Sequence, residues 1–141
     1  MNTNKITLSI QAKSQNESFA RSTVAAFFSQ LNPTIEQIED LKTAVSEAVT
    51  NCIVHGYEGS QQGKIEIKCM LDYQQKFIQV QIVDYGKGID DVTKAMQPFY
   101  TTVQSGERSG MGFTVMQAFC DKVEVASANG CTSVLLKKCV R

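Results

Sequence analysis

The chain has 141 residues, of which 43% are hydrophobic and 20% charged, a composition typical of one globular domain with a single core. Its formal net charge is zero, which argues against a broad basic surface for nucleic acid or for an anionic membrane. No apolar run approaches the roughly 20 residues of a membrane span, and the first residues lack the pattern of a secretory signal, so we expect a cytoplasmic protein.

The first part of the sequence predicts a strand followed by two helices. Residues 5–12 alternate apolar and polar side chains, which is typical of a half-buried strand. The polar stretch 14–18 ends in a possible helix cap, and the helix that follows would be stopped by Asn32 and Pro33. From there a second helix with an apolar stripe is expected to reach Gly56, a residue that suits a left-handed helix cap.

The rest of the chain predicts a hairpin, a long irregular segment, a short helix and two more strands. Residues 85–110 hold four of the nine glycines and show little periodicity, which is typical of a functional lid or of disorder. The regular elements expected are strands over 64–71 and 78–82, a helix over 111–120, and strands over 122–127 and 132–138.

The order of these elements predicts an α/β fold of the two-layer, α+β kind, formed as one domain over residues 1–141. One-sided alternation in the strands favours a mostly antiparallel sheet with helices on one face over a doubly wound parallel sheet, whose strands would be apolar throughout. The five cysteines include no CxxC pair, which favours reduced thiols over a zinc site or a disulfide framework.

Three polar residues of the second expected helix lie one turn apart along the edge of its apolar stripe. At ~100° per residue, Glu47, Asn51 and His55 form a slowly drifting line. Glu47 and Asn51 are consistent with a general base and a metal-positioning amide facing a cleft, and also with a partly exposed helix rim. A lone histidine beside a glycine cap is more often structural, so His55 receives no role.

Asp84 continues the core-facing side of its expected strand, because its parity matches that of the apolar residues within 78–82. A carboxylate in that position needs hydrogen-bond donors to offset its desolvation. Gly86 and Gly88 follow, and their missing side chains let another group approach the backbone. The pattern fits an acceptor for a ligand amine such as that of adenine, whereas the guanine carbonyl would be repelled. It also fits an Asp-led turn with two glycines.

A glycine-rich stretch directly precedes the last expected helix. The backbone N–H groups of Gly110, Met111 and Gly112 would offer donors and the positive end of the helix dipole to a phosphate. Arg108 would add positive charge near a terminal phosphate. A single GxG also occurs at ordinary helix starts, and the stretch matches neither the P-loop nor the Rossmann pattern.

Together these motifs resemble the GHKL, or Bergerat-fold, superfamily of ATPases and kinases. Glu47 and Asn51 look like its N box. Asp84, Gly86 and Gly88 look like its G1 box, and Gly110 and Gly112 look like its G2 box. The resemblance covers nearly the whole chain. Within the superfamily, the chain is most similar to the serine-kinase anti-sigma factors of sporulating bacteria, over residues 14–21, 46–57 and 107–116.

The resemblance implies a Bergerat fold, a homodimer, and binding of ATP or ADP with Mg²⁺. It also implies two activities, which are to bind and inhibit the sporulation sigma factor F and to phosphorylate a serine of an anti-anti-sigma factor. Glu47 would be the general base that takes the substrate hydroxyl proton, and Asn51 would hold Mg²⁺. Arg21 would lie on the partner-binding surface.

The same resemblance implies a nucleotide pocket under a lid over about residues 89–110. Asp84 would bind the adenine amine, Arg108 would lie near the terminal phosphate, and Thr132 is the expected nucleotide-side threonine of the last strand. Val103 stands where such lids usually carry a lysine. The remaining residues expected in the pocket, the lid and the phosphate cradle are Gly86, Gly88, Thr101, Thr102, Ser109, Gly110, Met111 and Gly112.

Three alternatives share part of this pattern. One is an ATP-gated sigma-binding module without significant phosphoryl transfer, against which an intact Glu47 argues. Another is the related general-stress anti-sigma B kinase. The catalytic domain of a histidine kinase is disfavoured, because the single histidine lies inside the expected nucleotide helix and no phospho-acceptor helix precedes the domain. A lid of this length also predicts that ATP and ADP order it differently and so select the partner.

Overall fold

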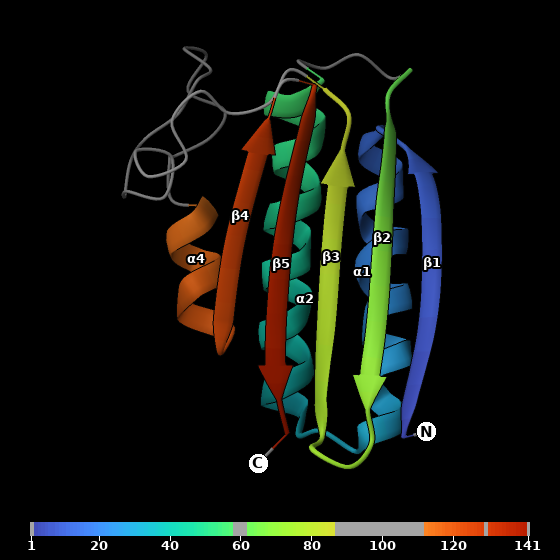
Figure 1. Ribbon diagram of the computed structural model, residues 1–141, viewed down its shortest axis with the longest axis vertical. Helices are drawn as coiled ribbons and strands as arrows, with labels where there is room; N and C mark the ends of the chain where they lie inside the picture. Colours follow the sequence, from blue (N-terminus) through green and yellow to red (C-terminus); the bar gives the residue numbers. More distant parts are fainter. Residues whose placement is uncertain (1, 58–61, 87–111, 129, 141) are drawn as a thin grey trace.

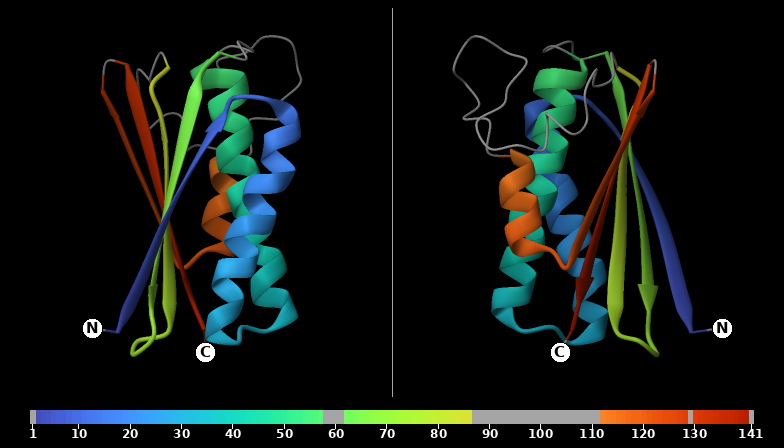
Figure 2. Two further views of the ribbon diagram at one scale, coloured as in Figure 1. Left: turned by 90° about the vertical axis from the view of Figure 1, so that its right-hand side faces the viewer. Right: turned by 60° about the vertical axis from the view of Figure 1, so that its left-hand side comes forward.

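The computed structural model describes residues 2–57, 62–86, 112–128 and 130–140. Within these ranges, five strands form one sheet and three helices cover one of its faces (Figure 1, Figure 2). The strands are β1 (Thr3–Gln11), β2 (Lys64–Asp72), β3 (Phe77–Asp84), β4 (Lys122–Ala128) and β5 (Cys131–Cys139), and the helices are α1 (Ser14–Phe28), α2 (Ile35–Asn51) and α4 (Gly112–Phe119). The predicted two-layer α/β fold is therefore confirmed.

The strands lie in the order β1-β2-β3-β5-β4, and each neighbouring pair is antiparallel. This arrangement confirms the predicted antiparallel sheet. β3 is the middle strand, so its last residue is flanked on both sides. Asp84 lies opposite Ile65 of β2 and opposite Thr132 of β5.

The core lies between the sheet and the helices. Alternation in β2 turns Ile65 and Ile67 into this core and leaves Lys64 and Lys68 exposed, as a strand with one covered face requires. α2 lies between α1 and α4 and packs against both (Figure 2). Within the described ranges, no helix combines the length and apolar character needed to cross a membrane.

α1 begins earlier than the sequence predicts. Its N-cap is Lys13, which has an extended backbone and makes no side-chain cap, and the polar residues Ser14 and Gln15 form an exposed first turn. Polar composition there reflects contact with solvent rather than a break before the helix, so the start expected after residue 18 is wrong. The predicted stop is confirmed, because Asn32 adopts a left-handed backbone with φ 54° after a short 3-10 turn.

α2 begins with a capping box and ends in a π turn. The Thr34 hydroxyl accepts from the Gln37 N–H at 3.1 Å, and the Gln37 side chain accepts from the Thr34 N–H at 2.8 Å. After Asn51 the chain widens into a π-helical turn over Cys52–Gly56. Gly56 is not among the described residues with positive φ, so the predicted left-handed cap is wrong. The absence of a side chain at Gly56 serves a different purpose, which involves Asp84.

Candidate functional site

Several elements end or begin together at one end of the molecule, the upper end in Figure 1. α2 and its π turn end there, β3 and β4 end there, and β2 and β5 begin there. This convergence brings together polar residues that are far apart in the sequence, including Asn51, Asp84 and Thr132.

Glu47 and Asn51 occupy the last turns of α2 and are half-buried, as is His55 in the π turn. Ala48 and Cys52, which directly follow Glu47 and Asn51 in the sequence, are fully buried. The carboxylate and the amide therefore lie where the helix passes from the core to its surface, as expected for the edge of an apolar stripe. Their chemical roles remain predictions.

Asp84 is buried with 3% of its surface exposed, which confirms the core-facing orientation predicted from strand parity. Its Oδ1 accepts a hydrogen bond from the Gly86 N–H at 3.0 Å. Burial raises the pKa of Asp84, while the Gly86 N–H and the Cys52 thiol act in the opposite direction. The result is a buried carboxylate acceptor that the Gly86 N–H holds in place.

Two glycines make room for this carboxylate. A Cβ on Gly56 would lie 2.9 Å from Cγ and Oδ1 of Asp84, so the bare backbone of the π turn packs on the carboxyl group. A Cβ on Gly86 would lie 1.9 Å from the carbonyl oxygen of Gly56. The close approach predicted at Gly86 is therefore present, and the group that approaches is the chain's own π turn.

Thr132 faces the same side of the sheet as Asp84. It lies directly opposite Asp84 in the β3–β5 register and is 7% exposed. Its neighbour Ser133 faces the other side, where it accepts from the Gln81 side chain at 2.9 Å. Of the two adjacent hydroxyl residues in this strand, Thr132 is therefore the one beside the buried carboxylate.

Ser127 is a further residue of this cluster that the sequence analysis did not single out. Its Oγ lies 3.1 Å from Oγ1 of Thr132, its partner in the β4–β5 register. Asp84, Thr132 and Ser127 thus form a polar row across three adjacent strands. The signal was present in the sequence, because Ser127 shares the parity of Val123 and Val125, which pack against the core.

Tyr57 joins the π turn to the sheet. Its hydroxyl accepts from the Tyr85 N–H at 2.7 Å and donates to the carbonyl oxygen of Lys64. Its ring packs on Gly63, where a Cβ would come within 2.5 Å of ring atoms. Burial raises the pKa of Tyr57, so the hydroxyl keeps its proton near neutral pH. No spacing in the sequence marks this residue, since its partners are backbone groups at the start of β2 and directly after β3.

Of the remaining predicted site residues, two lie within the described ranges and the others lie outside them. Gly112 is the first residue of α4, and Arg21 lies on α1, where its Nε is 3.5 Å from a carboxylate oxygen of Glu17. The predicted lid over about 89–110 lies outside the described residues. So do these individual predictions: Gly88, Thr101, Thr102, Arg108, Ser109, Gly110 and Met111.

Comparison with known families adds an independent finding. Residues 10–138 match the family described as the histidine kinase-like ATPase domain. An anti-sigma F factor of Thermoanaerobacter sp. (strain X514) is 58% identical over 128 residues, which are 91% of this chain and 87% of that protein. An anti-sigma F factor of Clostridium beijerinckii is 50% identical over 139 residues, which are 98% of this chain and 96% of that protein.

A solved structure shares the fold. The RsbU and RsbW domains of a Mycobacterium tuberculosis protein match 97% of this chain with a TM-score of 0.70 and 16% sequence identity. The match spans 32% of that longer chain. At this level of identity the likeness concerns the fold alone, and it supports the two-layer arrangement described above.

Proposed function

Because this chain belongs to the histidine kinase-like ATPase family, and within it to the anti-sigma factors, we propose that it binds and inhibits the sporulation sigma factor F. We further propose that it uses ATP and Mg²⁺ to phosphorylate a serine of an anti-anti-sigma factor. Both activities would draw on the cluster around Asp84, and the kinase activity would add Glu47 and Asn51.

The observation that carries the nucleotide part of this proposal is the buried pair of Asp84 and Thr132. Asp84 is a carboxylate acceptor with 3% exposure, and a threonine hydroxyl lies opposite it on the next strand. An acceptor beside a group that both donates and accepts matches the amine and ring nitrogen of adenine. The residues present therefore fit an adenine nucleotide.

The helix side of the cluster fits the metal and the phosphates. Asn51 offers a half-buried amide oxygen, the type of ligand that Mg²⁺ takes together with phosphate oxygens. Gly112 opens α4 and would contribute a backbone N–H at the helix N-terminus. The predicted residues Gly88, Thr101, Thr102, Arg108, Ser109, Gly110 and Met111 complete the proposed phosphate cradle and lid.

Bound Mg²⁺ and ATP would supply a phosphoryl group with its charge partly neutralised. The chain itself would position the reactants, which is the main requirement of phosphoryl transfer. Asp84 would orient the adenine ring by accepting from its amine, and Asn51 would fix the metal. Glu47 lies one turn from Asn51 on α2 and would accept the proton of the incoming serine hydroxyl.

The proposal includes three properties of the assembled protein. We propose that it acts in the cytoplasm as a homodimer, and that Arg21 belongs to the surface that meets its partners. Arg21 is only half-buried on α1, which is compatible with such a contact. The predicted difference between the ATP and ADP states of the lid would then select between the sigma factor and the anti-anti-sigma factor.

Two alanine variants test the assignment of roles. Glu47→Ala should bind ATP as the wild type does and lose about 100-fold or more in transfer to the anti-anti-sigma factor, because the general base is missing. Asp84→Ala should weaken ATP binding itself, as measured by calorimetric titration. Glu124→Ala is the matched control, since Glu124 lies exposed on β4 with 53% of its side-chain surface accessible.

The outcomes separate the parts of the proposal. Near wild-type transfer by Glu47→Ala contradicts the base assignment, and unchanged ATP affinity in Asp84→Ala contradicts the adenine assignment. If the wild type binds ATP and the sigma factor but transfers no phosphate to the anti-anti-sigma factor, the chain is a nucleotide-gated binding module rather than a kinase.

A further inference from the structure

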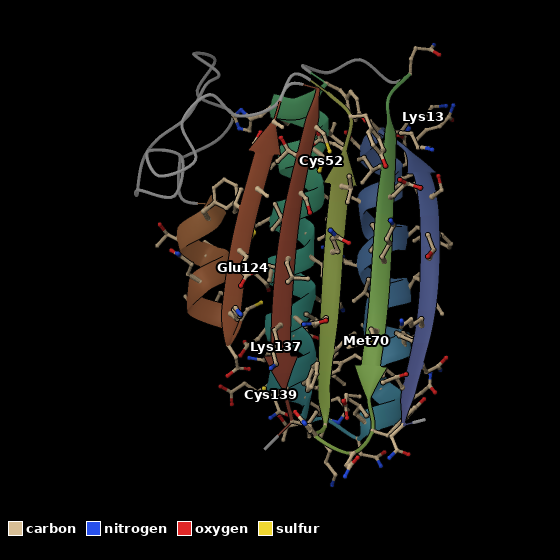
Figure 3. The ribbon with its side chains drawn as sticks, viewed as in Figure 1. Lys13, Cys52, Met70, Glu124, Lys137 and Cys139 are labelled. Carbon is tan, nitrogen blue, oxygen red and sulfur yellow. The ribbon has the colours of Figure 1, made fainter. Side chains whose placement is uncertain are left out.

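The end of the molecule opposite Asp84 carries an open hollow of about 350 Å³, the lower hollow. Its volume lies at the small end of the range for ligand pockets, which is roughly 300–1,000 Å³. Three segments contribute to it, which are the 3-10 turn after α1, the turn between β2 and β3, and the chain after β5. Figure 3 labels Cys139, which directly precedes the last of these segments, at the lower end of β5. The lining residues are Gln30, Leu31, Asn32, Tyr73, Lys76 and Val140.

Hydrogen bonds between these segments hold the walls of the lower hollow. The Tyr73 hydroxyl donates to Oε1 of Gln30 at 2.9 Å and accepts from Nδ2 of Asn4 at 3.2 Å. The Val140 N–H donates to the carbonyl oxygen of Lys76 at 2.9 Å. The hollow is therefore formed by the chain itself, and a ligand that enters it does not have to order these segments.

The polar groups that remain in the lower hollow are donors. Since Oε1 of Gln30 accepts from Tyr73, the amide nitrogen of Gln30 can donate to a ligand. Within the part of the chain that the structure describes, Lys76 forms no ion pair. The carboxylate of the turn, Asp72, instead accepts from two N–H groups of the turn at 3.0 and 2.8 Å. None of the six described lining residues is acidic, so the hollow is complementary to a carboxylate.

Apolar surface surrounds these donors. Leu31 forms a buried wall, and Val140 is half-buried. Tyr73 exposes 38% of its surface, and Ile35, the first residue of α2, exposes 80%. Ile35 follows Asn32 by three residues, so their Cα atoms lie within about 11 Å of each other. Aromatic and aliphatic side chains exposed beside a hollow are typical of a surface that binds a protein partner.

We propose that the lower hollow docks an acidic segment of a protein partner, in which an apolar side chain enters the hollow and a neighbouring Asp or Glu carboxylate meets Lys76. The apolar side chain would pack on Leu31, Val140 and the ring of Tyr73. A small free carboxylate would fill the hollow and leave Ile35 uncovered, whereas a peptide that crosses its mouth would cover both. The inference does not rest on the proposed nucleotide site, which lies at the other end of the strands.

Peptide selection on the full chain tests this inference. A phage-displayed library of random heptapeptides is first depleted on Lys76→Gln and then selected on the wild type, and the enriched peptides should carry an acidic residue next to an apolar one. Synthetic copies should bind Lys76→Gln about five- to tenfold more weakly than the wild type, because a hydrogen bond to a charged group is lost. Lys122→Gln is the matched control and should bind as the wild type does, since Lys122 is an exposed lysine of β4 paired with Glu124.

Two further measurements locate the bound peptide. Amide chemical-shift changes should appear in 30–32, in 73–76 and at Val140, and not in the π turn Cys52–Gly56. Ile35→Ser should bind the peptide about three- to fivefold more weakly, because apolar contact area is lost. Phe19→Ser is its control, since Phe19 is an apolar side chain of α1 that is 57% exposed and lies outside the lining.

Several results would overturn the inference. They are the absence of any enriched peptide, enriched peptides that lack an acidic residue, chemical-shift changes away from the lower hollow, and an equal loss of affinity in Lys122→Gln and Lys76→Gln. Isovalerate serves as a small carboxylate with an apolar body. If it binds the wild type as tightly as the peptides do, and Ile35→Ser leaves both affinities unchanged, the hollow takes a small anion and the docking proposal is wrong.

Discussion

Asp84 brings a carboxylate into the interior at the end of the middle strand, and burial of this charge lowers the free energy of unfolding. Burial raises the pKa of Asp84, and the Gly86 N–H and Cys52 thiol offset this only in part. A raised pKa means that the folded chain holds the proton more tightly than the unfolded chain does. As the pH rises through the interval between the two pKa values, the free energy of unfolding therefore decreases.

Asp84→Asn should accordingly stabilise the protein without nucleotide at neutral pH. The amide keeps an oxygen for the Gly86 N–H and removes a charge from a buried place. The melting temperature should exceed that of the wild type at pH 7, and the difference should shrink as the pH is lowered toward the ordinary pKa of aspartate. Thermal denaturation over a pH series measures this, with Glu124→Gln as an exposed control. A lower melting temperature at pH 7 would contradict the argument.

Lys138 connects three secondary-structure elements with one side chain. It extends from β5, and its Nζ donates to the carbonyl oxygen of Phe119 at the end of α4 at 2.6 Å. The same Nζ lies 3.3 Å from a carboxylate oxygen of Asp40 on α2, and 12% of the lysine side chain is exposed. A cation at a helix C-terminus satisfies orphan carbonyls and the dipole. The contact fixes the end of α4 against the helix that carries Glu47.

Lys138→Met should lower the free energy of unfolding by about 1–3 kcal/mol, because a half-buried carboxylate and a helix-end carbonyl lose their donor. Adding Asp40→Asn should recover part of that loss, since the unpaired charge is then removed. Urea denaturation measures both. Lys122→Met is the control, because its ion pair with Glu124 is exposed and should contribute little. A loss in Lys122→Met equal to that in Lys138→Met would count against the proposed connection.

At the scale of the whole molecule, the candidate site occupies one end of the sandwich and a different feature occupies the other. The turn between β2 and β3 lies at the end opposite Asp84 (Figure 1). Gln30, Tyr73 and Lys76 contribute there to an open hollow of about 350 Å³. The strands run the full distance between the two ends, so a ligand at the Asp84 end would not contact this turn.

ATP should therefore stabilise the chain, and its local effect on hydrogen exchange should be confined to the Asp84 end of the strands. Nucleotide at 100 times its dissociation constant adds about 2.7 kcal/mol to the free energy of unfolding. Hydrogen exchange with and without ATP should show slower local exchange in Cys52–Gly56 and at the end of β3. Residues Tyr73–Lys76 should show no local change. Protection confined to that turn would contradict the proposed nucleotide site at the Asp84 end.

Much of the fold was predictable because its signals are local. Alternation along β2 and β3 identified the faces of the sheet, and the same parity rule turned Asp84 inward. The spacing of Glu47 and Asn51 placed them at the edge of a helix stripe. The start of α1 was not predicted, because a polar exposed first turn has the composition of a loop.

The missed residues depend on contacts between strands or between layers. Ser127 joins the cluster through its register with Thr132, and Tyr57 joins it through backbone groups at the start of β2 and directly after β3. Cys52 resembled an ordinary member of an apolar stripe, and its effect on the pKa of Asp84 depends on how α2 packs on the sheet. Periodicity reports which side a residue faces, but not which partner it meets there.

The contact between Gly56 and Gly86 has a consequence for how the two layers move. At this point the helix layer and the sheet meet backbone to backbone, and a Cβ on Gly86 would lie 1.9 Å from the Gly56 carbonyl oxygen. Contacts between side chains can absorb a small displacement by changing rotamers, whereas two bare backbones cannot. A shift at the end of α2 must therefore be transmitted directly to the end of β3.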